Sequence, residues 1–233
     1  MELSSETIAQ LRAEHEAALA KMSKTIAADE QRSKEWYEMR RGRFTASEIH
    51  KLMGVKGLGE TGTTYCFEKA VEIVFGIDEE EDFTSWDMKR GIELEPKAFA
   101  KFKELKSKEG IEVKESFFFP YTDDAGASPD AIVGHDACEE TKCPRSKKFF
   151  RLVAKGFEAI DKEYVWQMQM QMLASNSQRC HFFNYIVFKD QEMWHEIIVD
   201  RDEAMISLIK ERLEPAVKLR NEFVQYLLNN RQF

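Results

Sequence analysis

The stretch that most constrains this chain is residues 121–144, YTDDAGASPDAIVGHDACEETKCP. In it, Asp130 is followed by nine residues and then by Glu140, Thr141 and Lys142. Side chains of a β-strand alternate between its two faces, so Glu140 and Lys142 should point the same way. Residues 131–134 are typical of a strand end and residues 134–136 of a tight turn, and a hairpin of this length returns Asp130 to the side of Glu140. We therefore expect two carboxylates and one ammonium group to meet at one point.

Such a cluster suits the hydrolysis of phosphate esters. Carboxylate oxygens are ligands that Mg²⁺ and Mn²⁺ prefer. A lysine beside such a metal can orient or deprotonate a water molecule and can neutralise negative charge that develops on a phosphate. The alternative is an exposed, charged hairpin without chemistry. The spacing D-x9-E-x-K is the signature of PD-(D/E)XK nucleases, and both the preceding GASPD and the following Cys143-Pro144 favour the nuclease interpretation.

The composition excludes several classes of protein. A chain of 233 residues, 43% of them hydrophobic, is long enough for one domain with a sizeable core. It contains no apolar run of the ~20 residues that a membrane span needs, and its polar start predicts no signal peptide. The four cysteines have no C-x2-C spacing, which argues against a zinc or iron–sulfur site and fits the reduced cytoplasm where we expect the protein.

Charge is distributed unevenly along the chain. The net charge of −8 is unusual for a protein that binds nucleic acid. Residues 32–43 and 145–148 are nevertheless rich in lysine and arginine, whereas residues 78–82 form an acidic run. A nuclease needs a basic channel only around its site, so the net charge does not exclude DNA as a substrate.

The first 34 residues are predicted to form an amphipathic helical extension, with the helix over about residues 5–28. This helix could dock on the rest of the protein or contact another subunit or partner. Residues 35–233 are predicted to form a single domain. Its helices and strands indicate an α/β fold with a mixed central β-sheet flanked by helices.

The second informative stretch is 45–48, TASE, which matches a capping box and predicts a helix that starts at Thr45. Ser47 would lie in the first turn of this helix, and Arg40 lies just upstream. A helix N-terminus with a hydroxyl and a nearby arginine is a good phosphate site. The alternative is a simple cap beside a solvated basic loop.

The third stretch is a helix predicted over residues 86–105. Met88, Ile92, Glu95, Phe99 and Phe102 follow a helical spacing, which would place Glu95 on an apolar face. A buried carboxylate is costly unless it is paired or binds a metal. The alternatives are a glutamate at the edge of the face that reaches solvent, and a helix that Pro96 interrupts.

Together these stretches resemble one family, the lambda-phage-type recombination exonucleases, which are a branch of the PD-(D/E)XK superfamily. The matching stretches occur in the family's order between about residues 35 and 225. They are Trp36-x3-Arg40-x-Gly42-x2-Thr45-Ala46-Ser47-Glu48, Gly91-x3-Glu95, Ser128-Pro129-Asp130, Glu140-Thr141-Lys142-Cys143-Pro144, Gly156-Phe157-Glu158-Ala159-Ile160, Tyr164-x2-Gln167-x-Gln169 and, at the start of the last helix, Val199-x-Arg201-Asp202-Glu203.

The resemblance implies a restriction-endonuclease-like core and a role for each matching residue. The metal, Mg²⁺ with Mn²⁺ as a substitute, would be held by Asp130, Glu140 and the carbonyl of Thr141. Lys142 would act on the attacking water, Gln167 would help to hold that water or the lysine, and Glu95 would be a supporting carboxylate. The terminal 5′-phosphate would be bound by Arg40, Ser47 and Ser128.

The resemblance further implies the activity and the partners. The protein would digest one strand of linear double-stranded DNA in the 5′→3′ direction and leave 3′ single-stranded overhangs for recombination by strand annealing. It would form a homotrimeric ring and work with a single-strand annealing protein. The chain departs from the family at Ala131, where glycine is usual, and in a shorter segment before Ser128, where a further family carboxylate would fall at Asp123.

Two other functions remain open at this stage. One is a structure-specific or restriction-type endonuclease. The other is a catalytically silent DNA-binding module, against which the intact Asp130, Glu140 and Lys142 argue.

Overall fold

The computed structural model describes residues 33–76 and 86–230. The chain divides into two units, residues 1–39 and 40–233. In the first unit the described part is a short segment that enters helix α2 (Lys34–Arg40). The helix predicted over about residues 5–28 and the acidic run at 78–82 lie outside the described residues.

The centre of the second unit is a five-stranded mixed sheet with the order β2-β5-β6-β7-β8. Strands β6 and β7 are parallel, and the other neighbours are antiparallel. The prediction of a mixed central sheet is confirmed. The strands are β2 (Val113–Glu115), β5 (Ala131–Val133), β6 (Ala137–Lys142), β7 (Arg179–Phe188) and β8 (Gln191–Asp200).

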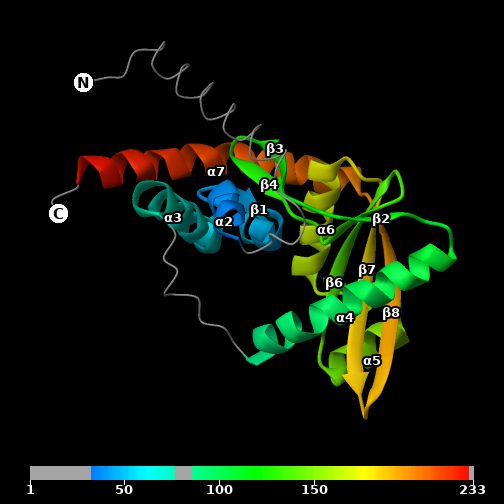
Figure 1. The fold of residues 1–233 in the computed structure, drawn as a ribbon. Helices are drawn as coiled ribbons and strands as arrows, with labels where there is room; N and C mark the ends of the chain where they lie inside the picture. Colours follow the sequence, from blue (N-terminus) through cyan, green and yellow to red (C-terminus); the bar gives the residue numbers. More distant parts are fainter. Residues whose placement is uncertain (1–32, 77–85, 231–233) are drawn as a thin grey trace. The chain divides into compact units, whose positions relative to one another are not determined.

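Helices cover both faces of this sheet. Successive side chains of a strand point to opposite faces, and both Phe182 and Phe183 of β7 are buried. Phe183 faces α4 (Trp86–Lys108), where its ring lies 5.1 Å from that of Phe102. The preceding residue, Phe182, faces the other way and packs with Leu152 of α5 (Ser146–Lys155) and Met168 of α6 (Lys162–Ser175). Figure 1 shows α4 lying across strands β6, β7 and β8.

A second, smaller sheet joins three short strands in the order β1-β4-β3. These strands are β1 (Phe44–Thr45), β4 (Ala125–Ala127) and β3 (Phe119–Thr122). They contribute to a separate core with the 3₁₀ helix η2 (Ala46–Leu52), α3 (Gly59–Phe75) and α7 (Glu203–Asn229). The sequence did not predict this sheet, because strands of two to four residues are too short to show a periodic pattern.

Local signals set the ends of several other elements. The turn between β7 and β8 consists of Lys189 and Asp190, which have positive φ angles of 50° and 60° as a tight hairpin turn requires. Gly156 ends α5 with a φ of 58°, and it is followed by the short helix η4 (Gly156–Ala159). The Asp202 carboxylate caps α7 by accepting from the backbone N–H of Ala204 at 2.8 Å.

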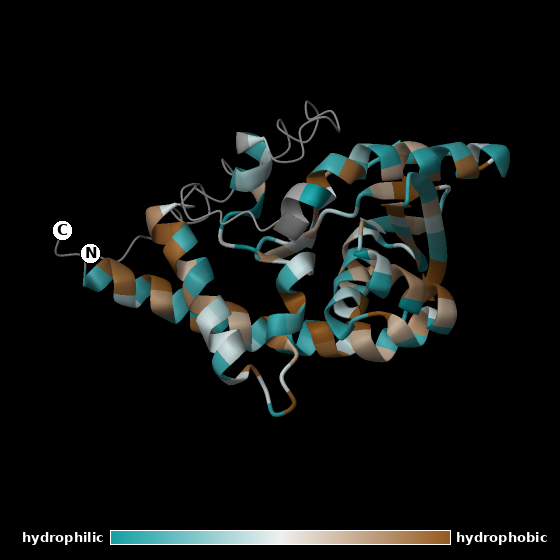
Figure 2. Cartoon of the chain, turned by 90° about the horizontal axis from the view of Figure 1, so that it is seen from below, coloured by the Kyte–Doolittle hydropathy of each residue, from teal (hydrophilic) through white to brown (hydrophobic). Residues whose placement is uncertain are grey.

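The long helices are amphipathic. Figure 2 shows hydrophilic and hydrophobic residues side by side along them, as expected for helices with one buried face. None of the helices among the described residues combines the length and the apolar character that crossing a bilayer requires.

Candidate active site

The hairpin of β5 and β6 brings Asp130 and Glu140 together, as predicted. Ala131 pairs with Glu139 across the hairpin, which sets Asp130 opposite Glu140. The N–H of Asp130 donates to the carbonyl of Glu139 at 2.9 Å, and the N–H of Thr141 donates to Asp130 Oδ2 at 2.8 Å. The Asp130 carboxylate is therefore anchored to the strand that carries its partner.

Lys142 lies on the same face of β6 as Glu140. Its Nζ donates a hydrogen bond to Glu140 Oε1, and the Glu140 side chain is almost completely buried. Burial by itself would lower the pKa of the Lys142 ammonium group, but the negative charges of Glu140 and Asp130 outweigh burial and raise this pKa above its ordinary value. The predicted meeting of two carboxylates and one ammonium group is thus present.

Two glutamines of α6 complete the surroundings of Glu140. Gln167 Nε2 donates to Glu140 Oε1 at 2.8 Å, and Gln171 Nε2 donates to Glu140 Oε2 at 2.5 Å. The two glutamines are four residues apart and so share one face of the helix. Gln169 points elsewhere and donates to the carbonyl of Asp200 at 2.9 Å. The sequence analysis missed Gln171, although its spacing from Gln167 was a signal that could have found it.

The charges at this site fit a divalent cation. Burial, and then the negative charge of Glu140, raise the pKa of the Asp130 carboxyl to about 8, because two carboxylates in a buried place disfavour ionisation. Burial and the nearby Asp130 also raise the pKa of Glu139 well above its ordinary value. A cation would offset this repulsion.

The donor set is compatible with magnesium. Within residues 33–76 and 86–230, no group of three or more His, Cys, Asp or Glu side chains is arranged to hold a metal. Mg²⁺ is commonly held by only one or two carboxylates and takes its other oxygens from water and from substrate phosphate. Asp130 and Glu140 therefore suffice as protein carboxylates for such an ion.

Glu95 does not lie on an apolar face of α4, so that prediction is wrong. The helix continues through Pro96 and buries Ala98 and Phe102, whereas Ile92 is 43% exposed and Glu95 is also exposed. The side chain of Met88 lies outside the described residues. The face that packs on the sheet instead contains Ala98 and Phe102, with Leu94 partly buried beside them.

Glu95 is nevertheless close enough to act on the site. Its negative charge adds to burial and to the charge of Glu140 in raising the pKa of Asp130. Burial, and then Glu95, raise the pKa of the Cys143 thiol to about 12. Its role as a supporting carboxylate stays a prediction.

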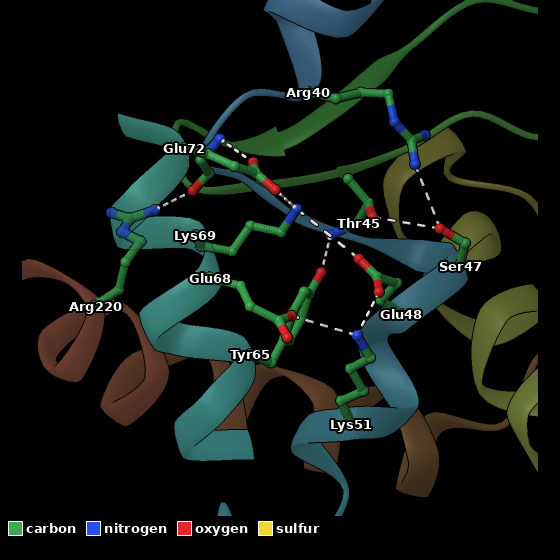
Figure 3. A network of polar contacts seen from close by, with 11 residues as sticks. Arg40, Thr45, Ser47, Glu48, Lys51, Tyr65, Glu68, Lys69, Glu72 and Arg220 are labelled. Atoms are coloured by element: carbon green, nitrogen blue, oxygen red, sulfur yellow. Dashed lines mark hydrogen bonds and ion pairs between the residues drawn. The ribbon is translucent and has the colours of Figure 1, made fainter. Parts of the chain in front are cut away.

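Arg40 and Ser47 come together at a separate point, shown in Figure 3. Arg40 Nη2 donates to Ser47 Oγ at 3.3 Å, and Thr45 Oγ1 lies 3.4 Å from the same oxygen. The predicted proximity of the arginine and the serine is confirmed. The two side chains come from either side of the β1 strand, which is short enough to let them meet.

The capping box predicted here is wrong. The helix that follows Thr45 is the 3₁₀ helix η2, and no side chain caps it. Glu48 instead makes ion pairs with Lys51 at 2.5 Å and with Lys69 at 3.8 Å. Burial would raise the pKa of Glu48, but these lysines hold it below its ordinary value. The Glu48 carboxylate, which would accept a backbone N–H in a capping box, is therefore paired with these lysines instead.

The backbone between Arg40 and Ser47 is held by hydrogen bonds from two helices (Figure 3). The N–H of Gly42 donates to Glu72 Oε2 at 2.8 Å, and its carbonyl accepts from Arg220 Nη1 at 2.8 Å. Gly42 has a φ of +68°, and a Cβ atom there would come within 2.3 Å of Ile73. The positive φ and this close approach explain why position 42 is a glycine.

Ser128 and Asp123 lie in different surroundings. The carbonyl of Ser128 accepts from Gln171 Nε2 at 3.5 Å, which connects Ser128 to the Glu140 side of the site. Its hydroxyl is buried and has no hydrogen-bond partner among the described residues. Asp123 lies in the turn between β3 and β4, where its carbonyl accepts from Arg43 Nε at 2.9 Å and its side chain is exposed.

Comparison with known proteins identifies the family. A YqaJ-like viral recombinase domain matches residues 35–178. The chain belongs to this family. YqaJ-like recombinases are of the lambda-exonuclease type, so the resemblance noted in the sequence is confirmed.

Solved structures agree with this membership. An alkaline exonuclease from Laribacter hongkongensis, LHK-Exo, is 28% identical, with a TM-score of 0.72 over 84% of this chain and 97% of that chain. A second structure of LHK-Exo, in complex with dAMP, matches with the same identity and TM-score. A phage-related exonuclease from Haemophilus somnus 129PT, 18% identical with a TM-score of 0.63, shares the fold over 79% of this chain and 96% of that chain.

No curated protein shows a significant match to the chain. The fold of this YqaJ-like recombinase is nonetheless that of a PD-(D/E)XK-like nuclease, with the mixed sheet and flanking helices described above.

Proposed function

We propose that this protein is a metal-dependent exonuclease of DNA recombination. It would digest one strand of linear double-stranded DNA in the 5′→3′ direction from 5′-phosphorylated ends and leave 3′ single-stranded overhangs. The observation that carries this proposal is the convergence of Asp130, Glu140 and Lys142 on one face of the β5–β6 hairpin. Membership of the YqaJ-like family and the similarity to an alkaline exonuclease support it.

Asp130, Glu140 and the carbonyl of Thr141 would hold the metal, Mg²⁺ or Mn²⁺ as a substitute. When bound, the metal would supply positive charge against the charge that develops on the phosphate and would acidify water. The protein's own contribution is to keep the carboxylates in place. The Thr141 N–H fixes Asp130, and Gln167 and Gln171 each hold one oxygen of Glu140.

Lys142 would act on the attacking water and on the phosphate. Its Nζ is held by Glu140 and lies 5.0 Å from the centre of the Tyr164 ring, so the ammonium group is confined to one place. An ammonium group there can donate a hydrogen bond that orients water, and it can neutralise a phosphate oxygen.

Arg40, Ser47 and Ser128 would bind the terminal 5′-phosphate. An arginine offers the fork of N–H groups that matches phosphate oxygens, and the two serines offer hydroxyl donors. The buried Ser128 hydroxyl has no partner among the described residues, as expected of a group that serves a ligand. Binding of the 5′ end would set the register of the strand and would therefore fix both the polarity and the single-nucleotide step.

The Arg40→Ala variant should lose its preference for phosphorylated ends. We expect digestion of 5′-phosphorylated duplex to slow by about 10- to 100-fold, the value of one charge-assisted hydrogen bond, while digestion of 5′-hydroxyl duplex changes little. Initial rates on the two substrates measure this. Arg41→Ala, the same change at the next residue, is the control. Equal loss on both substrates would contradict the phosphate pocket.

The activity itself is tested by digestion of three DNA substrates with Mg²⁺. They are linear duplex with 5′-phosphate, linear duplex with 5′-hydroxyl, and covalently closed circular duplex. We expect rapid loss of the phosphorylated linear duplex and no attack on the circle. Cutting of the circle would identify an endonuclease instead. Inactivity on all three substrates with both Mg²⁺ and Mn²⁺ would identify a silent DNA-binding module.

We also propose a homotrimer and a single-strand annealing protein as partner. Both rest on membership of the lambda-type family. Light scattering measures the mass of the assembly in solution, and a mass other than that of three chains would contradict the trimer. Co-purification with a single-strand annealing protein would test the partner.

A further inference from the structure

A pocket of about 530 Å³ lies beyond the carboxyl end of β6, close in sequence to Lys142. Three elements form it, which are the first half of α4, the start of α5 and the end of β7. Its lining residues are Arg90, Arg145, Ser146, Ile186, Val187 and Phe188. None of these residues belongs to the metal site or to the pair of Arg40 and Ser47, so the pocket is a separate feature.

Two of the residues that line the pocket are positively charged. Arg90 Nη1 donates to the carbonyls of Cys143 at 2.6 Å and Pro144 at 3.1 Å, so its guanidinium is held against the backbone that follows Lys142. Arg145 occupies the N-cap position of α5, whose first turn contains no acidic residue. Both charged side chains that line the pocket are therefore cationic, and the start of α5 adds the positive end of a helix dipole.

The residues that β7 contributes to the lining are apolar and partly aromatic. Ile186 is buried, whereas Val187 is 39% exposed at the pocket wall. The Phe188 ring is held edge-on by Phe150 at 5.4 Å between ring centres. The Lys189 ammonium group, which is not among the lining residues, lies 5.6 Å from the centre of the Phe188 ring. The pocket thus sets a fixed aromatic side chain beside two guanidinium groups.

We propose that this pocket binds one nucleotide of an unpaired DNA strand, with its phosphate at Arg90 and Arg145 and its base against the apolar residues that β7 contributes to the lining. The volume is within the range of about 300–1,000 Å³ that small-ligand sites occupy. A base within a duplex is stacked and paired, so only an unpaired base could reach the apolar wall. This inference rests on the proposed function to the extent that DNA is the substrate.

The binding test uses the full chain and a fluorescent single-stranded oligodeoxythymidine of about 12 nucleotides, with EDTA present so that the DNA stays intact. Val187→Asp places a carboxylate on the pocket wall. We expect it to weaken binding by at least ~10-fold, because it repels phosphate and removes apolar contact with a base. Val153→Asp is the control, since Val153 is similarly exposed, at 48%, but does not line the pocket. It should change the affinity by less than about 2-fold.

A second variant tests the phosphate contact by salt dependence. Loss of one phosphate contact on a single strand lowers the slope of log affinity against log salt by ~0.7. We expect this change for Arg145→Gln and none for Arg151→Gln, an exposed arginine on the same helix outside the pocket. Thermal unfolding of all four variants shows whether each is folded.

The base contact is tested by competition. Thymidine monophosphate should displace the oligonucleotide at lower concentration than inorganic phosphate does. Equal displacement would overturn the base contact. Equal weakening by Val187→Asp and Val153→Asp, or failure of the wild-type chain to bind the oligonucleotide, would overturn the pocket as a strand site. The digestion assay tests the proposed function separately. If the wild-type chain digests DNA but Val187→Asp binds the oligonucleotide as tightly as the wild type does, only this inference is rejected.

Discussion

Substitution of Lys142 by alanine should abolish DNA cleavage and leave DNA binding intact. Lys142 is the only ammonium group among the described residues that donates to Glu140, and its loss removes the positive charge that would act on water and on the scissile phosphate. Removal of one such group from an active site typically costs about 10²–10³ in rate, and we expect at least ~10³-fold because this lysine serves two purposes. Single-turnover cleavage at saturating DNA measures the rate, and filter binding with EDTA measures affinity.

Lys148→Ala is a close control for this prediction. Lys148 lies over the same Tyr164 ring, at 4.5 Å from its centre, but its ion-pair partner is Asp161 at 2.5 Å. Each variant removes one ammonium group that lies over the Tyr164 ring, so the two substitutions differ only in which lysine is lost. Lys148→Ala should keep most of the cleavage rate at saturating DNA. If Lys142→Ala also kept most of the rate, the role assigned to Lys142 would be wrong.

Substitution of Asp130 by asparagine should remove both metal binding and cleavage. The Asp130 side chain accepts a hydrogen bond from the Thr141 N–H, and an asparagine carbonyl can accept the same bond, so the hairpin should stay folded. The variant lacks one of the two carboxylates of the site. We expect Mn²⁺ binding, measured by electron paramagnetic resonance, to weaken by at least ~10-fold and cleavage to fall by at least ~10³-fold.

Asp136→Asn is the matched control in the same hairpin. Asp136 lies in the turn, where its carboxylate forms an exposed ion pair with Arg179 at 3.4 Å. This variant should bind Mn²⁺ and cleave DNA like the wild type. An Asp130→Asn protein that is folded and binds Mn²⁺ normally would show that the metal lies elsewhere.

Contacts between residues close along the chain could be predicted from the sequence, whereas contacts between distant residues could not. Asp130, Glu140 and Lys142 belong to one hairpin, in which strand alternation and the length of the turn dictate which side chains meet. The spacing alone therefore predicted this cluster. Gln171 reaches Glu140 from another helix, and the order of residues gave no direct indication that this face of α6 meets β6.

Two predictions failed because distant residues determine a local conformation. Helical spacing placed Glu95 on an apolar face, but the contact of α4 with the sheet buries Ala98 and Phe102. The TASE stretch has the composition of a capping box, yet Lys69 of α3 contributes to the ion pairs that hold Glu48. Propensity and pattern are weak compared with tertiary contacts of this kind.

The sequence by itself determined the cluster of Asp130, Glu140 and Lys142, the mixed sheet and the proximity of Arg40 to Ser47. The cluster and the proximity involve segments near each other along the chain, and the sheet follows from the pattern of its strands. Only the tertiary structure decided the contacts of Gln167 and Gln171 with Glu140, the network beneath Gly42 and the pocket beyond β6. Each of these joins segments whose separation along the chain is large, and their meeting depends on how the helices pack on the sheet. Such packing carries no short-range signal, so it could be read only from the folded protein.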